Sequence, residues 1–161
     1  MTDKPHQLEL QSLLTSTLVG EMALGECLSL AATNTLADAA RAMRGASHGS
    51  AVVCSGGKLV GIFTERDLLR VIAAGRSLNS PVSDAMTARP KTVTTQDTLF
   101  EVARSMDEGG YRRLPVVDST GAPVGVVDVK ALVHFLVEHF PAAVYNQASH
   151  AQLLAKRREG A

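Results

Sequence analysis

The sequence contains no tryptophan, only four phenylalanines and two tyrosines, and no excess of either charge. So few aromatic rings leave little surface on which single-stranded bases could stack, which argues against nucleic-acid recognition. The 16 basic and 16 acidic residues cancel, so no net field attracts the whole chain to nucleic acid or to an anionic membrane. Any site for an anion must therefore depend on local charges.

Cysteines and long apolar runs are also scarce. Cys27 and Cys54 both lie among apolar residues, which is typical of free thiols in a reducing compartment and not of a disulfide framework. Residues 1–7 lack the apolar segment of a secretion signal, and no run approaches the roughly 18 apolar residues of a membrane span. We expect an unprocessed cytoplasmic protein with no membrane segment.

The common catalytic and metal-binding motifs are missing. There is no Gly-x-x-x-x-Gly-Lys-Ser/Thr loop, no Gly-x-Ser-x-Gly turn and no Gly-x-Gly-x-x-Gly turn. The five histidines include no pair four residues apart and no cysteine neighbour at zinc-like spacing. We therefore expect neither an enzyme nor a metal site, and no cofactor.

What the sequence does contain is an internal repeat. A chain of 161 residues that is 45 % hydrophobic is long enough to form one compact core. Self-similarity covers nearly all of residues 26–140, and two copies of one supersecondary unit explain it. Thr98-Leu-Phe-Glu101 lies 63 positions after Thr35-Leu-Ala-Asp38. After one extra residue in the second copy, Val116-Val117 aligns with Val52-Val53, and Gly121-Ala-Pro-Val-Gly125 aligns with Gly57-Lys-Leu-Val-Gly61.

Each copy predicts the element order βαββα. A short strand precedes a helix with apolar residues at helical spacing, and two apolar strands joined by a hairpin turn precede a second helix. The first helix of each copy begins with a threonine and has an acid three residues later, which is the signature of a capping box. The strands are expected at 27–30, 50–54 and 59–63 in the first copy and at 91–94, 114–118 and 124–127 in the second.

A βαββα unit of this size exposes one face of its sheet, so the two copies should pack together. The predicted fold is α+β, with two βαββα repeats packed sheet to sheet about a pseudo-two-fold axis and grooves between them. Terminal helical segments flank the pair, the second one finished by the basic triplet Lys156-Arg-Arg158. The predicted boundaries are 1–20 for the N-terminal extension, 21–75 for repeat 1, 76–81 for the linker, 82–140 for repeat 2 and 141–161 for the C-terminal helix and tail.

Several motifs, in this order and partly twice over, resemble a tandem pair of CBS (cystathionine-β-synthase-type) domains. In that family the clefts between repeats bind adenosine-containing ligands, and pairs associate into disc-like dimers. The resemblance therefore implies a ligand-binding regulatory module that forms a homodimer. The motifs are Gly57-Lys-Leu-Val-Gly-Ile-Phe-Thr-Glu-Arg-Asp67, Asp84-Ala-Met-Thr87, Pro90-Lys-Thr-Val93, Arg112-Arg-Leu-Pro-Val-Val-Asp118 and Gly121-Ala-Pro-Val-Gly-Val-Val127.

The segment Thr64-Glu-Arg-Asp67 joins a strand to a helix and has two interpretations. As a helix start, Thr64 and Asp67 form a capping box worth about 1 kcal/mol. By resemblance it is the family's ligand motif, in which the hydroxyl of Thr64 lies near phosphate or ribose and Asp67 accepts hydrogen bonds from the ribose. The free N–H groups of a helix N-terminus suit the phosphate in either case.

Further ligand contacts are expected around this helix start. A phosphate needs local cations, although each cation taken alone could be an ordinary solvated surface charge. The resemblance also places the adenine against the partner repeat and the paired strands. The cationic candidates are His48, Arg66, Lys91, Arg112 and Arg113, and the adenine candidates are Ala51, Ile62, Met86, Lys91, Thr92 and Tyr111.

The second copy departs from the ligand motif. Asp128-Val-Lys-Ala131 stands where the first copy has Thr64-Glu-Arg-Asp67. Asp128 can still cap its helix, but it would repel a phosphate, and Ala131 offers no acceptor to a ribose. The sequence therefore predicts one competent cleft.

The predicted function is a non-catalytic module that senses AMP, ADP or ATP and signals to a separately encoded effector. NAD and S-adenosylmethionine stay open, because a ribose acceptor does not distinguish them. One alternative is a dimerisation scaffold that binds no nucleotide. The other is a nucleic-acid-binding module that uses Arg112, Arg113 and the basic triplet, which the neutral charge of the chain disfavours.

Overall fold

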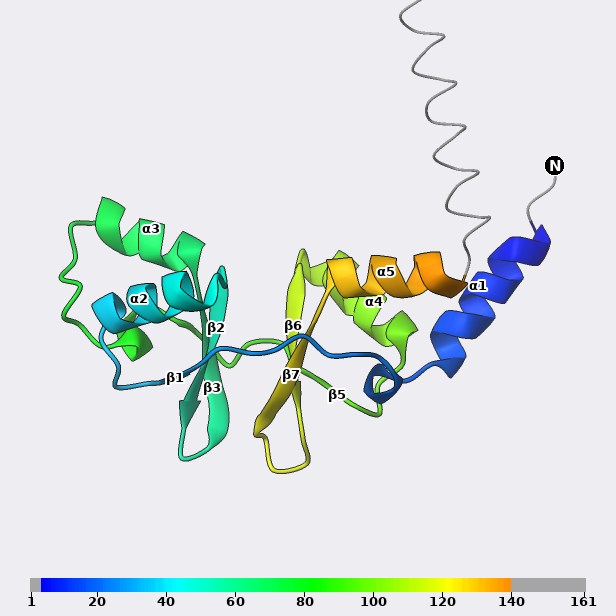
Figure 1. Cartoon of the computed structure of the whole chain (residues 1–161), viewed down its shortest axis with the longest axis horizontal. Coiled ribbons are helices and arrows are strands. Elements are labelled where there is room, and N and C mark those ends of the chain that lie inside the picture. The colour runs from blue at the N-terminus through cyan, green and yellow to red at the C-terminus, as the bar shows by residue number, and fades with distance from the viewer. Residues whose placement is uncertain (1–3, 140–161) are drawn as a thin grey trace, which may run out of the picture.

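A computed structural model of the chain describes residues 4–139, so the helix expected within 141–161 lies outside the described residues. The described chain alternates short strands and helices in two similar halves (Figure 1). The helices are α1 (Lys4–Ser16), α2 (Leu36–Ala46), α3 (Glu65–Ala73), α4 (Leu99–Gly109) and α5 (Val129–His139), with 3-10 turns η1 (Val19–Glu21) and η2 (Val82–Asp84). The strands are β1 (Ser29–Ala31), β2 (Ser50–Ser55), β3 (Lys58–Thr64), β4 (Thr87–Ala88), β5 (Val93–Thr94), β6 (Arg113–Val117) and β7 (Pro123–Asp128).

The predicted βαββα order is confirmed in both halves. The first sheet has the strand order β1-β2-β3-β4 and the second has the order β5-β6-β7. In each sheet a parallel pair is followed by an antiparallel hairpin, β1·β2 then β2·β3 and β5·β6 then β6·β7. The two hairpins lie at the centre of the molecule with the helices outside them (Figure 1), so the repeats pack sheet to sheet as expected. The two-residue strand β4 was not predicted, because a strand this short has no recognisable period.

The first helix of each repeat begins with the predicted capping box. The side-chain oxygen of Thr35 accepts a hydrogen bond from the backbone N–H of Asp38 at 3.1 Å. In the same way, Thr98 accepts from the backbone N–H of Glu101 at 3.2 Å. These contacts satisfy N–H groups that the helix itself leaves unpaired, so both helix starts are fixed by residues readable from sequence.

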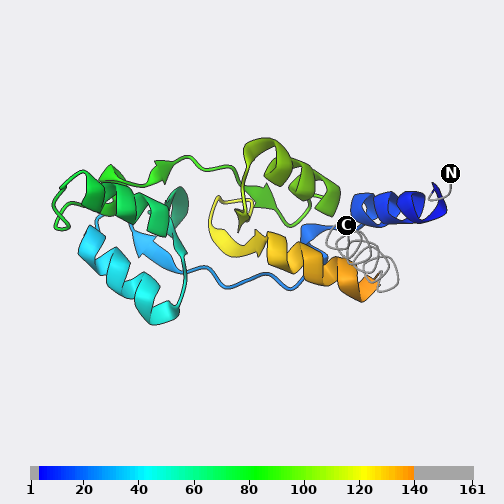
Figure 2. The same ribbon diagram turned by 90° about the horizontal axis from the view of Figure 1, so that it is seen from above.

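The cores of the two repeats are interleaved along the chain. Val19 precedes β1, the first strand of repeat 1, but is buried in the core of repeat 2, and Val82 precedes β5, the first strand of repeat 2, but is buried in the core of repeat 1. Backbone hydrogen bonds fix both segments: Val19 N–H donates to Asp97 at 2.9 Å and Val82 N–H donates to Asn34 at 2.8 Å. Two extended segments accordingly cross between the halves (Figure 2). Each repeat therefore completes its core with the leading segment of the other repeat.

The strand registers correct one part of the sequence alignment. Val53 lies opposite Gly61 in the first hairpin, and Val116 lies opposite Gly125 in the second. Val53 therefore corresponds to Val116 and not, as the alignment has it, to Val117. The extra residue of the second copy lies in its hairpin turn, after the strand and not before it. A run of two valines matches equally well in either register, so the sequence did not resolve the difference.

In each hairpin, a glycine of the second strand is covered by a side chain from an incoming segment. A Cβ atom at Gly61 would collide with the thioether of Met86, and a Cβ at Gly125 would approach the Cβ of Leu24 to 2.8 Å. Glycine at both positions therefore lets the incoming segment lie flat against the strand. The segment around β4 covers the first hairpin in the way that the segment around Leu24 covers the second.

The two sheets meet through few polar contacts. The guanidinium of Arg113 donates to the hydroxyl of Ser50 at 3.1 Å, which joins the first residues of β6 and β2. At the other end of the hairpins, Leu59 N–H donates to the carbonyl of Gly121 at 2.9 Å. Ser50 and Arg113 occupy equivalent positions in the two repeats, opposite Thr64 and Asp128. The pseudo-two-fold axis therefore passes close to the Arg113–Ser50 contact.

Candidate functional site

The candidate site is the junction between β3 and α3, where Thr64 ends the strand and Asp67 lies in the first helical turn. The hydroxyl of Thr64 accepts from Asp67 N–H at 3.3 Å, and Oδ2 of Asp67 accepts from Thr64 N–H at 2.9 Å. The Thr64 hydroxyl also donates to this oxygen at 2.7 Å. The capping interpretation of Thr64 and Asp67 is thus confirmed, and it uses only one of the two carboxylate oxygens.

The second oxygen of Asp67 has a weaker partner. Oδ1 accepts a hydrogen bond from Arg70 at 3.3 Å, while 70 % of the Arg70 side chain is exposed. The residue Asp67 itself is 7 % exposed and is the one buried charged residue in the described part of the chain. A carboxylate oxygen accepts more than one hydrogen bond, and an exposed arginine can leave at little cost. Oδ1 can therefore accept a hydroxyl group of a ligand without disturbing the helix cap.

Residues from both repeats meet near this helix start. Ser50 lies opposite Thr64 in the β2·β3 register, and Arg113 from repeat 2 reaches Ser50. The carbonyl of Gly49 also accepts from Glu65 N–H at 3.1 Å, which holds the beginning of β2 against the first turn of α3. Of the predicted cations, Arg113 is thus the one that a hydrogen bond connects across the repeats to this junction. Ser50 was missed, although its equivalence to Arg113 in a corrected repeat alignment would have indicated it.

The other predicted cations are spread more widely. His48 is half-buried and precedes β2, and Arg66 is exposed on the first turn of α3. Arg112 belongs to the second junction, because its carbonyl accepts from Val129 N–H at 3.1 Å as α5 begins. Lys91 is exposed in the stretch of chain that connects β4 to β5. Within residues 4–139, no side-chain hydrogen bond joins these four residues to Thr64 or Asp67, so their role in binding stays a prediction.

The predicted adenine contacts divide into core and surface residues. Ala51 is 2 % exposed, so little of its side chain is available to a ligand, whereas Met86 is half-buried and packs against the same core. Ile62 is half-buried on β3, opposite Val52. Tyr111 is 44 % exposed with its ring over Gly109. Thr92 is half-buried just before β5, and its part in the site likewise stays a prediction.

The second junction has a cap but no acid in the first helical turn. Oδ1 of Asp128 accepts from Ala131 N–H at 2.7 Å, which confirms the predicted capping role of Asp128. Ala131 carries no acceptor at the position of Asp67. Arg113 lies opposite Asp128 across the β6·β7 pair, so an anion here would meet a carboxylate as well as a guanidinium. The two junctions therefore differ in charge although their backbones match.

Other kinds of site find no support in residues 4–139. This part of the chain contains no group of three or more His, Cys, Asp or Glu residues placed to hold a metal ion. It also has no helix that is long and apolar enough to cross a membrane. Cys27 and Cys54 are unpaired and half-buried, and burial raises the pKa of the Cys27 thiol. A raised pKa leaves less of the nucleophilic thiolate.

Two repeats with exchanged segments and a Thr-x-x-Asp helix start define a paired-repeat fold, and sequence comparison gives its family. The profile described as "CBS domain" matches residues 19–74 and 82–138. The chain belongs to the CBS-domain family and contains a tandem pair. Both matches begin at or next to the segment that packs into the opposite core.

Similar proteins occur in several other organisms. The chain is 33 % identical over 124 residues to an uncharacterized 17.7 kDa protein of Acidianus ambivalens, which covers 76 % of this chain and 75 % of that protein. It is 30 % identical over 125 residues to the CBS domain-containing protein CBSCBSPB3 of Arabidopsis thaliana, of which it spans only 22 %. A solved CBS domain protein of Pyrobaculum aerophilum, in complex with AMP, is 25 % identical with a TM-score of 0.67 and covers 83 % of this chain and 98 % of that one.

Proposed function

We propose that this chain is a non-catalytic regulatory module that binds an adenine nucleotide beside Thr64 and Asp67 and signals to a separate effector protein. The observation that carries this proposal is the carboxylate of Asp67, whose Oδ1 has only the exposed Arg70 as its partner and which lies next to a helix N-terminus and near an arginine of the other repeat. The AMP complex of the similar Pyrobaculum aerophilum protein supports the ligand class. AMP, ADP and ATP share the groups that this junction can contact.

In the proposed complex each part of the nucleotide has its own partners. Oδ1 of Asp67 accepts a ribose hydroxyl in place of Arg70. The phosphate lies at the first turn of α3, where backbone N–H groups and the helix dipole favour an anion, and Arg113 contributes a bidentate cation. His48, Arg66, Lys91 and Arg112 add weaker positive charge. Ile62, Met86, Thr92, Tyr111 and the backbone of Ala51 are the proposed surroundings of the adenine.

Signalling follows from the position of Arg113. Its contact with Ser50 is a link between the two sheets, and a phosphate would compete for the same guanidinium. Binding would then favour one arrangement of the repeats over another, because the ligand has different affinities for the two. The effector responds to that arrangement.

A homodimer is the proposed assembly. Large apolar side chains are exposed on α3, where Leu69 is 66 % and Ile72 is 55 % exposed, and on α5, where Val133 is 51 % exposed. Exposed apolar residues repeated on two equivalent helices favour burial against a second copy. Analytical ultracentrifugation tests this, with Leu69→Lys expected to shift the protein towards the monomer.

The ligand is tested by calorimetric titration with AMP, ADP and ATP, supported by thermal shift with NAD and S-adenosylmethionine. Asp67→Asn keeps a cap acceptor but loses the charge, and we expect it to weaken nucleotide binding at least about tenfold, the loss of one charge-assisted hydrogen bond. Asp38→Asn is the matched control, because Asp38 has the same capping box and an ion pair with Arg41. Equal binding by both variants would refute the site.

A nucleotide-free scaffold is the second candidate. It is favoured by the fact that Asp67 already has Thr64 and Arg70 as partners, together with the exposed apolar residues of α3 and α5. Absence of any thermal shift with all five ligands, in a protein that still dimerises, would support the scaffold over the sensor.

A further inference from the structure

A groove lies on repeat 2 away from the Thr64 junction, between α5 and the segment that enters from the N-terminus. Its volume is about 380 Å³, at the lower end of the range for small-molecule sites. The lining residues come from two stretches more than a hundred residues apart. They are Thr17, Glu21, Met22 and Ala23 from the first stretch and Ala131, His134, Phe135, Glu138 and His139 from α5.

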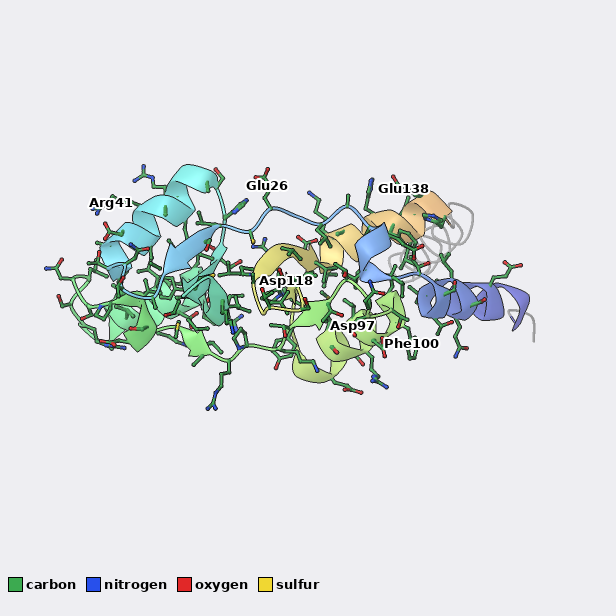
Figure 3. All side chains as sticks on the ribbon, turned by 90° about the horizontal axis from the view of Figure 1, so that it is seen from below. Glu26, Arg41, Asp97, Phe100, Asp118 and Glu138 are labelled. Atoms are coloured by element: carbon green, nitrogen blue, oxygen red, sulfur yellow. The ribbon has the colours of Figure 1, made fainter. Side chains whose placement is uncertain are left out.

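Each of the two walls of this groove carries an acidic residue. Glu21 ends η1, and its Oε2 accepts a hydrogen bond from Leu18 N–H at 2.6 Å, which fixes the carboxylate in place. Glu138 lies on the last turns of α5 (Figure 3), with its Oε1 3.1 Å from Nε2 of His134. Glu21 keeps its second oxygen, and each oxygen accepts more than one hydrogen bond. The groove therefore offers acceptors for a cation from two sides.

The groove also has an aromatic wall. The rings of Phe135 and His139 are stacked with their centroids 4.0 Å apart, and His139 Nδ1 lies 2.8 Å from the carbonyl of Phe135. Such a pair holds both rings in one orientation. A flat cation such as a guanidinium can lie against an aromatic face while it donates to carboxylates at its edge.

The equivalent region of repeat 1 contains guanidinium groups of the protein itself. There Arg76 donates to the carbonyl of Asp84, the acidic residue that ends η2 as Glu21 ends η1. Arg70 pairs with Asp67 on α3. The residue equivalent to Arg70 on α5 is His134, and no arginine or lysine lines the groove of repeat 2. Repeat 1 thus shows which kind of group this part of the fold accommodates.

We propose that the groove between η1 and α5 binds a small organic cation that carries a guanidinium or primary ammonium group. The cation donates to Glu21 and Glu138, and its flat or aliphatic part lies against Phe135. This site is separate from the nucleotide junction and does not depend on the proposed function. It would give the second repeat, which lacks the ribose acceptor, a ligand of opposite charge.

The probe for this site is agmatine, which carries a guanidinium and an ammonium group four methylenes apart. We expect saturable binding of agmatine to the full chain by calorimetry at low salt, with backbone NMR shifts concentrated at Ala23 and Ala131. The matched ligand control is 4-guanidinobutyrate, whose carboxylate replaces the ammonium group. It should bind at least about fivefold more weakly, because a carboxylate meets like charge in this groove.

The variants separate the groove from nonspecific attraction. Glu21→Gln together with Glu138→Gln should weaken agmatine at least about fivefold, since two partly exposed charge pairs are lost. Glu108→Gln is the control, because Glu108 has a similar i,i+4 ion pair on α4 with Arg104 and does not line the groove. Asp67→Asn should leave agmatine binding unchanged. Absence of saturable binding, or an equal loss in the Glu108→Gln control, would overturn the proposal.

Discussion

The two repeats have the same backbone arrangement, but the second helix of each is capped by different side chains. In repeat 1 a hydroxyl and a carboxylate cap α3 together, and the carboxylate keeps an oxygen with only an exposed arginine as its partner. In repeat 2 the carboxylate of Asp128 is itself the cap, and alanine follows at the position of Asp67. Both solutions stabilise the helix, so stability alone did not select the first one. This difference is the reason that we propose Asp67, and not its counterpart in repeat 2, as a ligand contact.

The interleaved cores make the strongest prediction. Val82→Ala should lower the free energy of unfolding by about 2 kcal/mol, the usual cost of removing two buried methyl-sized groups. Although Val82 begins repeat 2 in the sequence, the loss should appear in repeat 1, because Val82 is buried there. Hydrogen exchange should therefore speed up more at Leu36 than at Leu99, and Val19→Ala should show the reverse. The opposite pattern in either variant would contradict the exchange of segments.

The two hairpin glycines should differ in their tolerance to alanine. Gly125→Ala should cost about 1–3 kcal/mol, as overpacking does, because its new Cβ meets the Cβ of Leu24 and the backbone oxygen of Gly25. Gly61→Ala should cost less, since it meets only the flexible side chain of Met86. Urea unfolding of both variants measures the difference. Equal losses would show that the two covering segments are equally rigid.

The missing acid of repeat 2 can be restored. The double variant Asp128→Thr/Ala131→Asp should gain a second nucleotide site, so that calorimetry gives two nucleotides per chain in place of one. At ligand concentrations about ten times the dissociation constant, the second site adds about 1.4 kcal/mol of stability. Asp128→Thr alone keeps a cap and serves as the control. An unchanged stoichiometry in the double variant would mean that residues beyond the helix start define the site.

The smallest effect concerns acid pH, where the two repeats should behave alike. Hydrogen bonds from Thr35 and Arg41 hold the pKa of Asp38 below its ordinary value, and those from Thr98 do the same for Glu101. A carboxyl with a lowered folded-state pKa stabilises the protein above its unfolded-state pKa and loses this effect as the pH falls through the folded-state value. Asp38→Asn/Glu101→Gln should therefore flatten the fall in melting temperature between about pH 5 and 3. The same slope in the variant and the parent would refute this role.

The sequence predicted what depends on local periodicity and turn chemistry. The helices, hairpins and threonine caps were found because each is fixed by residues close to one another in the chain. The interleaving of the two cores was not predicted, because no residue near Val19 or Val82 in the sequence indicates which core either valine will enter. The Thr64–Asp67 junction was identified through its motif. Ser50 was missed through a one-residue slip in the alignment, and the groove at Glu21 and Glu138 was missed because its two walls are far apart in sequence.

The exchange of segments also constrains what a half-molecule can be. A polypeptide that held one repeat and its own leading segment would have an incomplete core and a hydrophobic segment with no place to bind. Two such polypeptides would complete each other by mutual exchange, which is the geometry of a domain-swapped dimer. In the present chain the linker between the repeats makes this exchange intramolecular. The effective concentration of one repeat around the other is then set by the linker and does not depend on the protein concentration. The tandem chain thus behaves as a tethered dimer of single repeats, and the tether leaves each half free to diverge.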